Sequence, residues 1–115
     1  MTDRELIEAA AKAAGYTSHG YGELVGNSPC LWLREADFTG MWAPLTDDGD
    51  ALRLMSRLNI NVSYRENING AWVVAEHEGI DFCPESLDGP HENDATRRAI
   101  VRAAASIGAA IGGVK

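Results

Sequence analysis

The stretch "MWAPLTDDGDALRL" (residues 41–54) places a tryptophan and a proline before three aspartates around a glycine, and an apolar run follows. Thr46 or Asp48 can cap a helix over "DALRLMSRL", because their side-chain oxygens accept hydrogen bonds from the free amides of a helix start. Three aspartates then lie near the positive end of this helix: Asp47, Asp48 and Asp50. The apolar face of the predicted helix has four members: Leu52, Leu54, Met55 and Leu58.

The aspartates also suggest a metal site, which we weigh against the capping role. An EF-hand loop has alternating ligands, a glycine at its sixth position and a glutamate at its twelfth. The segment "DDGDALRLMSRL" lacks that arrangement, which leaves a weak magnesium contact through Asp47 and Asp48 as the metal alternative. We therefore predict structural aspartates, no metal site and no cofactor.

Helical patterns occupy both ends of the chain. Thr2 and Glu5 form a capping box, and Gly15 is placed to end the first helix in a left-handed conformation. Asn93 is a candidate cap for a second long helix that runs to about Ala110. Its stripe is rich in alanine and includes Gly108, which favours close approach of backbones and could also support self-association into a homo-oligomer.

Short strand patterns lie between the helices. Apolar and polar residues alternate in "INVSY" (60–64), and "AWVVA" (71–75) follows the turn dipeptide Asn69-Gly70. Weaker strand patterns occur around residues 23–25, 30–33 and 80–82. We predict an α+β fold in a single domain (residues 1–115), with about three to five short antiparallel strands covered by about three helices in an α/β/α sandwich.

Charge is unevenly distributed along the 115 residues, whose net charge is −7. No lysine or arginine occurs between Arg65 and Arg97, an interval that carries eight acidic residues. Direct nucleic-acid binding is disfavoured, because neutralising phosphates requires clustered Lys and Arg. The interval is either a solvated acidic loop or a surface for a basic partner. The residues assigned to this acidic surface are Glu76, Glu78, Asp81, Glu85 and Asp88.

The cellular compartment of the protein and the oxidation state of its two cysteines can be predicted from the sequence. No apolar run reaches the ~20 residues of a membrane span, so no membrane partner is expected. The acidic start "MTDRELIEAA" lacks the features of a signal peptide. We therefore expect Cys30 and Cys83 to be reduced thiols in a cytoplasm.

Three tryptophans, Trp32, Trp42 and Trp72, are typical of core and sheet-face packing in a domain of this size. The alternative is an aromatic wall on which a planar ligand stacks. Trp42 is the preferred candidate for that role, because it lies next to a predicted helix start. The residues of this alternative ligand site are Trp32, Trp42, Arg53 and Arg57.

Three segments together resemble a family of small bacteriophage proteins described by a phage ABA-sandwich domain. They are "MTDRELIEAAAKAAGY" (1–16), "MWAPLTDDGDALRLMSRLNI" (41–60) and "ATRRAIVRAAASIG" (95–108). The middle segment is the most specific, and the sequence departs from the family mainly in the connection between the first two. The resemblance implies an α–β sandwich, a phage origin and action in the host bacterial cytoplasm. It implies no activity and no catalytic residues.

The leading functional hypothesis is a non-enzymatic bacteriophage accessory protein that binds a host component, for example by inhibiting a host defence or regulatory protein. The alternative is a binder or sponge for a small molecule such as a nucleotide. A metal-dependent enzyme that uses Asp47 and Asp48 is the third hypothesis. The residues show no catalytic motif, so we expect no enzymatic activity.

Overall fold

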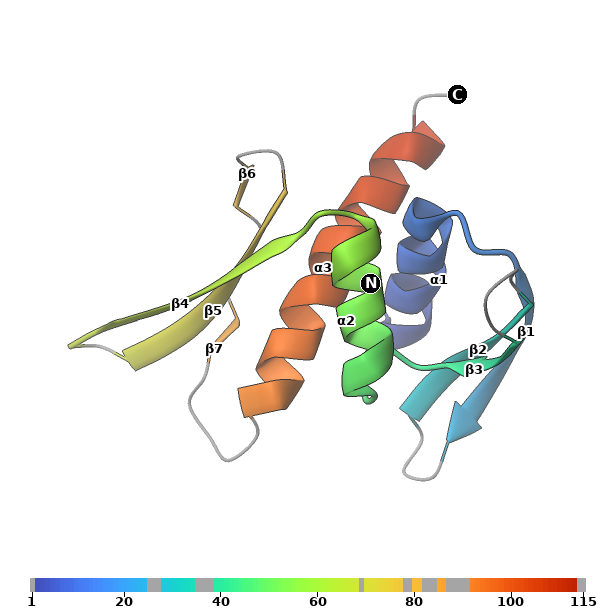
Figure 1. Cartoon of the computed structure of the whole chain (residues 1–115), viewed down its shortest axis with the longest axis horizontal. Coiled ribbons are helices and arrows are strands. Elements are labelled where there is room, and N and C mark those ends of the chain that lie inside the picture. The colour runs from blue at the N-terminus through green and yellow to red at the C-terminus, as the bar shows by residue number, and fades with distance from the viewer. Residues whose placement is uncertain are drawn as a thin grey trace.

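Three helices lie between two antiparallel sheets within the residues that the computed structural model describes, which are 2–24, 28–34, 39–68, 70–77, 80–81, 85–86 and 92–113 (Figure 1). The predicted α+β class, with three helices and antiparallel strands, is confirmed. The sandwich-like arrangement contains two separate sheets. Helix α2 follows the first three strands directly and separates them from the later hairpin, so helices lie between the sheets.

Helix α1 (Asp3–Ala14) has the predicted ends. The Thr2 hydroxyl accepts a hydrogen bond from the Glu5 amide, and the Glu5 carboxylate accepts one from the Thr2 amide, each at 3.2 Å. Gly15 ends the helix at φ 79°, where a side chain would be strained. The capping box and the glycine stop are therefore confirmed.

The first sheet contains β1 (Ser18–Leu24), β2 (Ser28–Arg34) and β3 (Thr39–Trp42) in the order β1-β2-β3. Leu31 and Leu33 on its inner face are buried in the core shared with α1. Strand β3 was not predicted, and β1 is longer than predicted. Both strands contain glycine, which is depleted in strands and hid them from a periodicity argument.

The N-cap of helix α2 (Asp48–Arg57) lies one residue away from each predicted cap. Its N-cap is Asp47, whose Oδ2 accepts a hydrogen bond from the Asp50 amide at 2.8 Å. Thr46 lies in the preceding turn, with its amide donating to the Ala43 carbonyl, and Asp48 is the first helical residue. The Asp47 side chain reaches the amide three residues on, as an N-cap does, which explains the correction.

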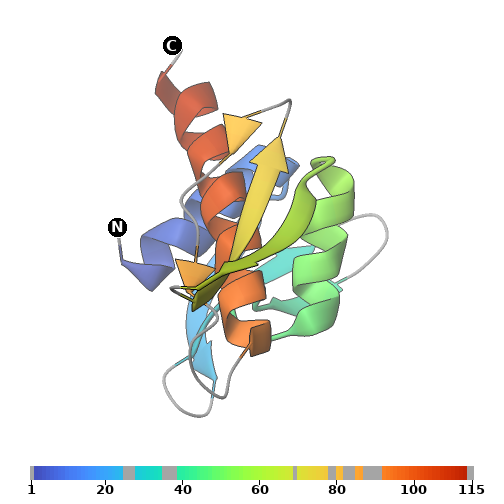
Figure 2. The same cartoon turned by 90° about the vertical axis from the view of Figure 1, so that its left-hand side faces the viewer.

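The second sheet is built on a hairpin of β4 (Asn61–Asn67) and β5 (Gly70–His77). Asn67 pairs with Gly70, so two residues connect the strands. Two short strands, β6 (Ile80–Asp81) and β7 (Glu85–Ser86), pair with β5. In Figure 2 the edge strand β4 lies between β5 and α2.

Helix α3 (Glu92–Gly113) runs through the middle of the molecule and packs against both α1 and β5 (Figure 1). It begins before Asn93, so the predicted cap residue lies inside the helix. Its alanine stripe is buried against α1, where Gly108 lies against the backbone of Ala9. The small residues of α3 therefore serve contact within the chain, as the close-approach argument predicted.

Candidate functional site

Two of the three aspartates of the opening stretch join β3 to α2. Asp47 caps the helix, and Asp50 is buried, with its Oδ2 accepting a hydrogen bond from the Ala43 amide at 2.9 Å. The other Asp50 oxygen pairs with Arg53. A buried carboxylate is stable only when it is bonded in this way. These two aspartates are structural, as the capping interpretation predicted.

The third aspartate, Asp48, connects α2 to α3 through Arg97. The Arg97 guanidinium pairs with Asp48 and Asp94, and its Nε donates to the Leu45 carbonyl at 2.9 Å. The Arg97 side chain is only 13% exposed, whereas those of Asp48 and Asp94 are 68% and 57% exposed. One cation is therefore buried beneath two carboxylates that face solvent.

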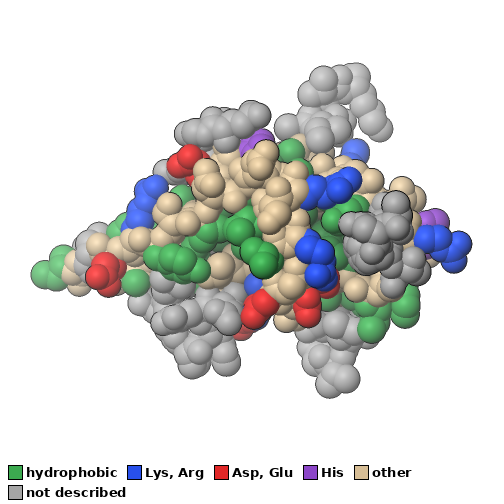
Figure 3. Space-filling model, viewed as in Figure 1, with side chains coloured by type: hydrophobic (Ala, Val, Ile, Leu, Met, Phe, Trp, Pro, Cys, Tyr) green, Lys and Arg blue, Asp and Glu red, His purple; other side chains and the backbone are tan. Residues whose placement is uncertain are grey.

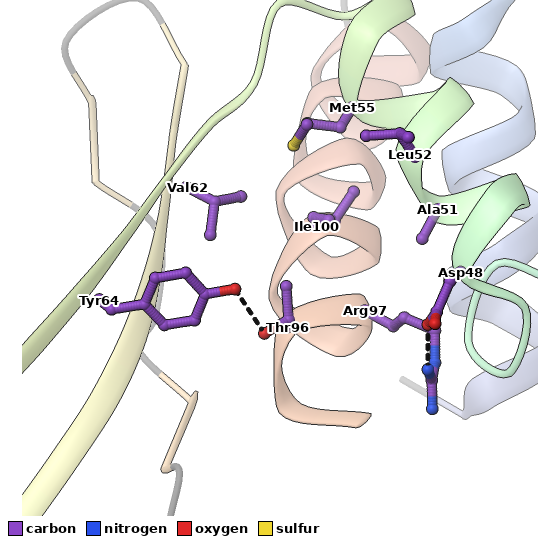
Figure 4. A pocket seen from close by; sticks show the side chains of 9 residues that line it. All are labelled: Asp48, Ala51, Leu52, Met55, Val62, Tyr64, Thr96, Arg97 and Ile100. Atoms are coloured by element: carbon purple, nitrogen blue, oxygen red, sulfur yellow. Dashed lines mark hydrogen bonds and ion pairs between the residues drawn. The ribbon is translucent and has the colours of Figure 1, made fainter. Parts of the chain in front are cut away.

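A groove of about 340 Å³ opens beside this ion-pair network (Figure 4). It lies between α2, α3 and the inner face of β4, with apolar side chains over most of its lining. The Tyr64 hydroxyl and the Thr96 hydroxyl are 3.2 Å apart and bridge β4 to α3. The lining residues of this groove are Asp48, Ala51, Leu52, Met55, Val62, Tyr64, Thr96, Arg97 and Ile100.

Two large side chains of the groove are exposed although they lie beside the core. Leu52 is 56% exposed and Tyr64 is 64% exposed, and Met55 and Val62 are half-buried between them. In the space-filling view, hydrophobic side chains gather between the hairpin and the helices, with charged side chains at the lower edge (Figure 3). An apolar concavity rimmed by polar groups is typical of a binding site.

The structure does not bring the four residues of the predicted ligand site together. Trp42 is fully buried, with its ring edge-on to Tyr16 at 5.6 Å between centroids, so it packs in the core and does not line the groove. Trp32 is half-exposed on the opposite face of the same sheet, because neighbouring positions along a strand alternate between faces. Arg53 pairs with Asp50, outside the groove lining.

Arg57, the last member of that predicted site, joins the ends of two helices. Its Nε donates to the Ala14 carbonyl at the end of α1, and its guanidinium lies 5.0 Å from the centroid of the Tyr16 ring. A cation near a helix C-terminus offsets the unpaired carbonyls there. Arg57 and Trp42 thus contact the same tyrosine, in a structural joint.

The predicted acidic surface lies partly outside the residues that the structure describes. Glu76 is half-buried on β5, and its Cα pairs with that of Asp81 on β6. Glu85 pairs through its backbone with Val73. Glu78 and Asp88 lie outside the described residues. The acidic surface therefore stays a prediction.

The described part of the chain offers few other groups for metal binding or catalysis. Among those residues no group of three or more His, Cys, Asp or Glu side chains comes together as a metal site would require. Cys30 is a free, buried thiol whose pKa is raised by burial. Cys83 lies outside the described residues.

The groove is the functional candidate that the sequence reasoning missed. Its members come from three separate segments, and each segment alone has an ordinary amphipathic pattern. The available sign was Leu52, which lies beside the arginine at position 53 on the polar side of α2, away from the buried Ala51 and Leu54. A large apolar residue there is not required by the core.

Within the described ranges no helix is long and apolar enough to cross a membrane. Comparison with protein-family models, with curated proteins and with solved structures found no match for this chain. The resemblance to the phage ABA-sandwich domain family therefore stays a prediction, and the geometry of the groove carries the functional argument.

Proposed function

We propose that this protein is a non-enzymatic binding protein that docks another protein in the groove between α2, α3 and β4. Following the resemblance, we assign it to bacteriophage accessory proteins that act in the host cytoplasm, and we take its partner to be a host defence or regulatory protein. The observation that carries the binding role is the exposure of Leu52 and Tyr64 in an apolar concavity. Contiguous exposed apolar surface is costly in water and is typical of interaction sites.

The polar groups of the groove favour binding over catalysis. The Tyr64 hydroxyl contacts Thr96, and the Asp48 carboxylate pairs with Arg97. A general base has to reach the proton that it removes, and a nucleophile needs a base beside it. Side chains that are bonded to one another across the groove fit a rigid recognition surface better than an acid–base pair.

The predicted acidic residues from Glu76 to Asp88 belong to this proposal as a source of long-range attraction. The net charge of −7 adds to their effect. Opposite charge on a partner raises the rate of association more than the final affinity, and salt weakens this effect. A basic host protein is therefore the partner that we expect.

Photo-crosslinking in living bacteria tests the proposal. A photoreactive amino acid replaces Leu52 in one variant and Ile68, a 99% exposed residue at the hairpin connection, in the control variant. We expect one dominant crosslinked host protein with the first variant and not with the second. Equal crosslinking at both positions, or none at position 52, would contradict docking in the groove.

A small-molecule ligand is the second candidate, because about 340 Å³ lies at the lower end of the ~300–1,000 Å³ range of ligand pockets. The exposed carboxylates of Asp48 and Asp94 favour a neutral or cationic apolar molecule over a nucleotide. Native mass spectrometry after exposure to bacterial extract separates the two candidates. A retained mass of a few hundred daltons that Leu52→Asn abolishes would favour the small molecule.

A further inference from the structure

The groove is bordered by β4, which is an edge strand of the second sheet among the described strands. Among the described strands, β4 pairs only with β5, so its other edge has no partner strand among them. Figure 2 shows β4 on the side of its sheet that faces α2, and residues of both β4 and α2 line the groove. A free edge presents a row of backbone donors and acceptors that another strand can pair with.

Side chains of β4 enter the groove with the spacing of a strand. Val62 and Tyr64 are two residues apart and line the same side of the groove, opposite Leu52 and Met55 of α2 (Figure 4). A segment paired with β4 would also project alternate side chains onto that face. These side chains would contact Leu52 and Met55, and Ile100 of α3 would lie beneath them.

The charged end of the groove favours a bound group of positive charge. Three groups are present there, two exposed carboxylates and the guanidinium of Arg97, so the local excess is one negative charge. Arg97 already donates to Asp48, to Asp94 and to the Leu45 carbonyl. An incoming anion would meet the two carboxylates first, whereas an ammonium or guanidinium group can bond to their remaining lone pairs.

We propose that the groove accepts an extended segment of a partner protein that adds to the outer edge of β4, places alternate apolar side chains against Leu52 and Met55, and carries a lysine or arginine beside Asp48 and Asp94. This inference rests on the proposed function and names the chemistry of the partner. A partner helix would fill the apolar groove but would leave the edge of β4 unpaired. An extended segment satisfies both features.

Selection from a displayed library of random twelve-residue peptides tests the inference. Peptides that bind the wild-type protein are then tested for binding to the Leu52→Asn variant. The Ile68→Asn variant, which also loses an exposed apolar side chain, is the matched control. A third variant, Asp48→Asn, loses one carboxylate beside Arg97 of α3. Its control is Asp3→Asn, which loses a carboxylate that pairs with the neighbouring Arg98 of α3. Circular dichroism confirms that each variant is folded before it is used.

We expect the binders to have apolar residues at every second position and at least one lysine or arginine. Leu52→Asn should weaken them at least about tenfold, the effect of losing one well-buried apolar contact. Asp48→Asn should weaken them about threefold or more at low salt, and the two controls should leave binding unchanged. Methylation of single peptide amides should weaken binding at alternate positions, as edge pairing requires.

Each of the other possible outcomes would overturn one component of the proposal: the extended conformation, the charge of the partner segment, or docking itself. Leu52-dependent peptides with apolar residues three and four apart, insensitive to amide methylation, would replace the strand with a helix and leave groove binding intact. Leu52-dependent acidic peptides would overturn the charge assignment alone. Selection that yields no Leu52-dependent peptide would overturn the proposed docking function together with this inference.

Discussion

The contact between α1 and α3 makes a severe test of the fold, because it depends on the absence of one side chain. A Cβ atom at Gly108 would lie 2.9 Å from the carbonyl carbon of Ala9 and closer still to its oxygen. Ordinary Cβ contacts begin at 3.4 Å, so Gly108→Ala forces the two helix backbones apart by at least about 0.5 Å. Both obstacles are backbone atoms, which no rotamer change can move.

Two opposing terms set the size of the effect. Alanine in place of glycine favours the helix by ~1 kcal/mol, and overpacking of a well-packed contact costs ~1–3 kcal/mol or more. We expect the clash to exceed the propensity gain, because α1 and α3 share the most extensive helix contact of the fold. The net loss in free energy of unfolding should be about 2 kcal/mol, which lowers Tm by roughly 6–12 °C.

Thermal and urea unfolding followed by circular dichroism measure this loss. Gly49→Ala in α2 is the control, because the atoms nearest to a Cβ there are side-chain atoms of Asp47 and Arg53, none closer than 3.2 Å. That control should stay within about 1 kcal/mol of wild type. Ala9→Gly should not rescue Gly108→Ala, because the obstacle is a carbonyl group. A Tm for Gly108→Ala equal to or above that of wild type would refute the packing argument.

Three further predictions concern the caps and the buried thiol. Arg57→Met removes the bond to the Ala14 carbonyl and the contact with Tyr16, and should cost about 1–2 kcal/mol in urea unfolding; wild-type stability would show that this joint is dispensable. Bonds from Thr2 lower the pKa of Glu5, so the stabilisation that they give is present above the ordinary glutamate pKa and is lost as pH falls through the lowered value. The Tm difference between wild type and Glu5→Gln should therefore shrink below about pH 4.3, and a difference that grows there would contradict the assignment. Burial raises the pKa of the Cys30 thiol, so iodoacetamide at pH 8 should alkylate Cys30 only after unfolding, as peptide mass mapping would detect, and rapid labelling of the native protein would show an open site.

The ends of α1 and the β4–β5 hairpin were the parts of the fold that the sequence predicted best. The capping box at Thr2 and the glycine stop at position 15 depend on bonds between residues close in the chain, so their spacing is enough to identify them. The hairpin of β4 and β5 followed from alternation. The cap of α2 was missed by one residue, because three consecutive candidates, Thr46, Asp47 and Asp48, can each offer an oxygen.

The first sheet was harder to predict because its strands β1 and β3 contain glycine. A Cβ at Gly22 would lie 3.4 Å from Sγ of Cys30, an ordinary van der Waals distance, so packing does not require glycine there. Sequence patterns associate glycine with turns, and this hid the strands. The same sheet places Trp42 at its inner end, buried against Tyr16, which a local pattern cannot distinguish from an exposed loop tryptophan.

The candidate site was identified because the helical periodicity of α2 and the observed burial of its side chains disagree at Leu52. Helical periodicity placed Leu52 with Leu54 on the core face of α2, yet Leu54 is fully buried and Leu52 is 56% exposed. Folding does not need a large apolar side chain at such a position, so Leu52→Asn should change the free energy of unfolding by no more than about 0.5 kcal/mol. A residue that stability does not require, and that water disfavours, needs another cause, and a partner that covers it supplies one. If Leu52→Asn instead unfolds the protein, Leu52 belongs to the core and the groove loses its main support.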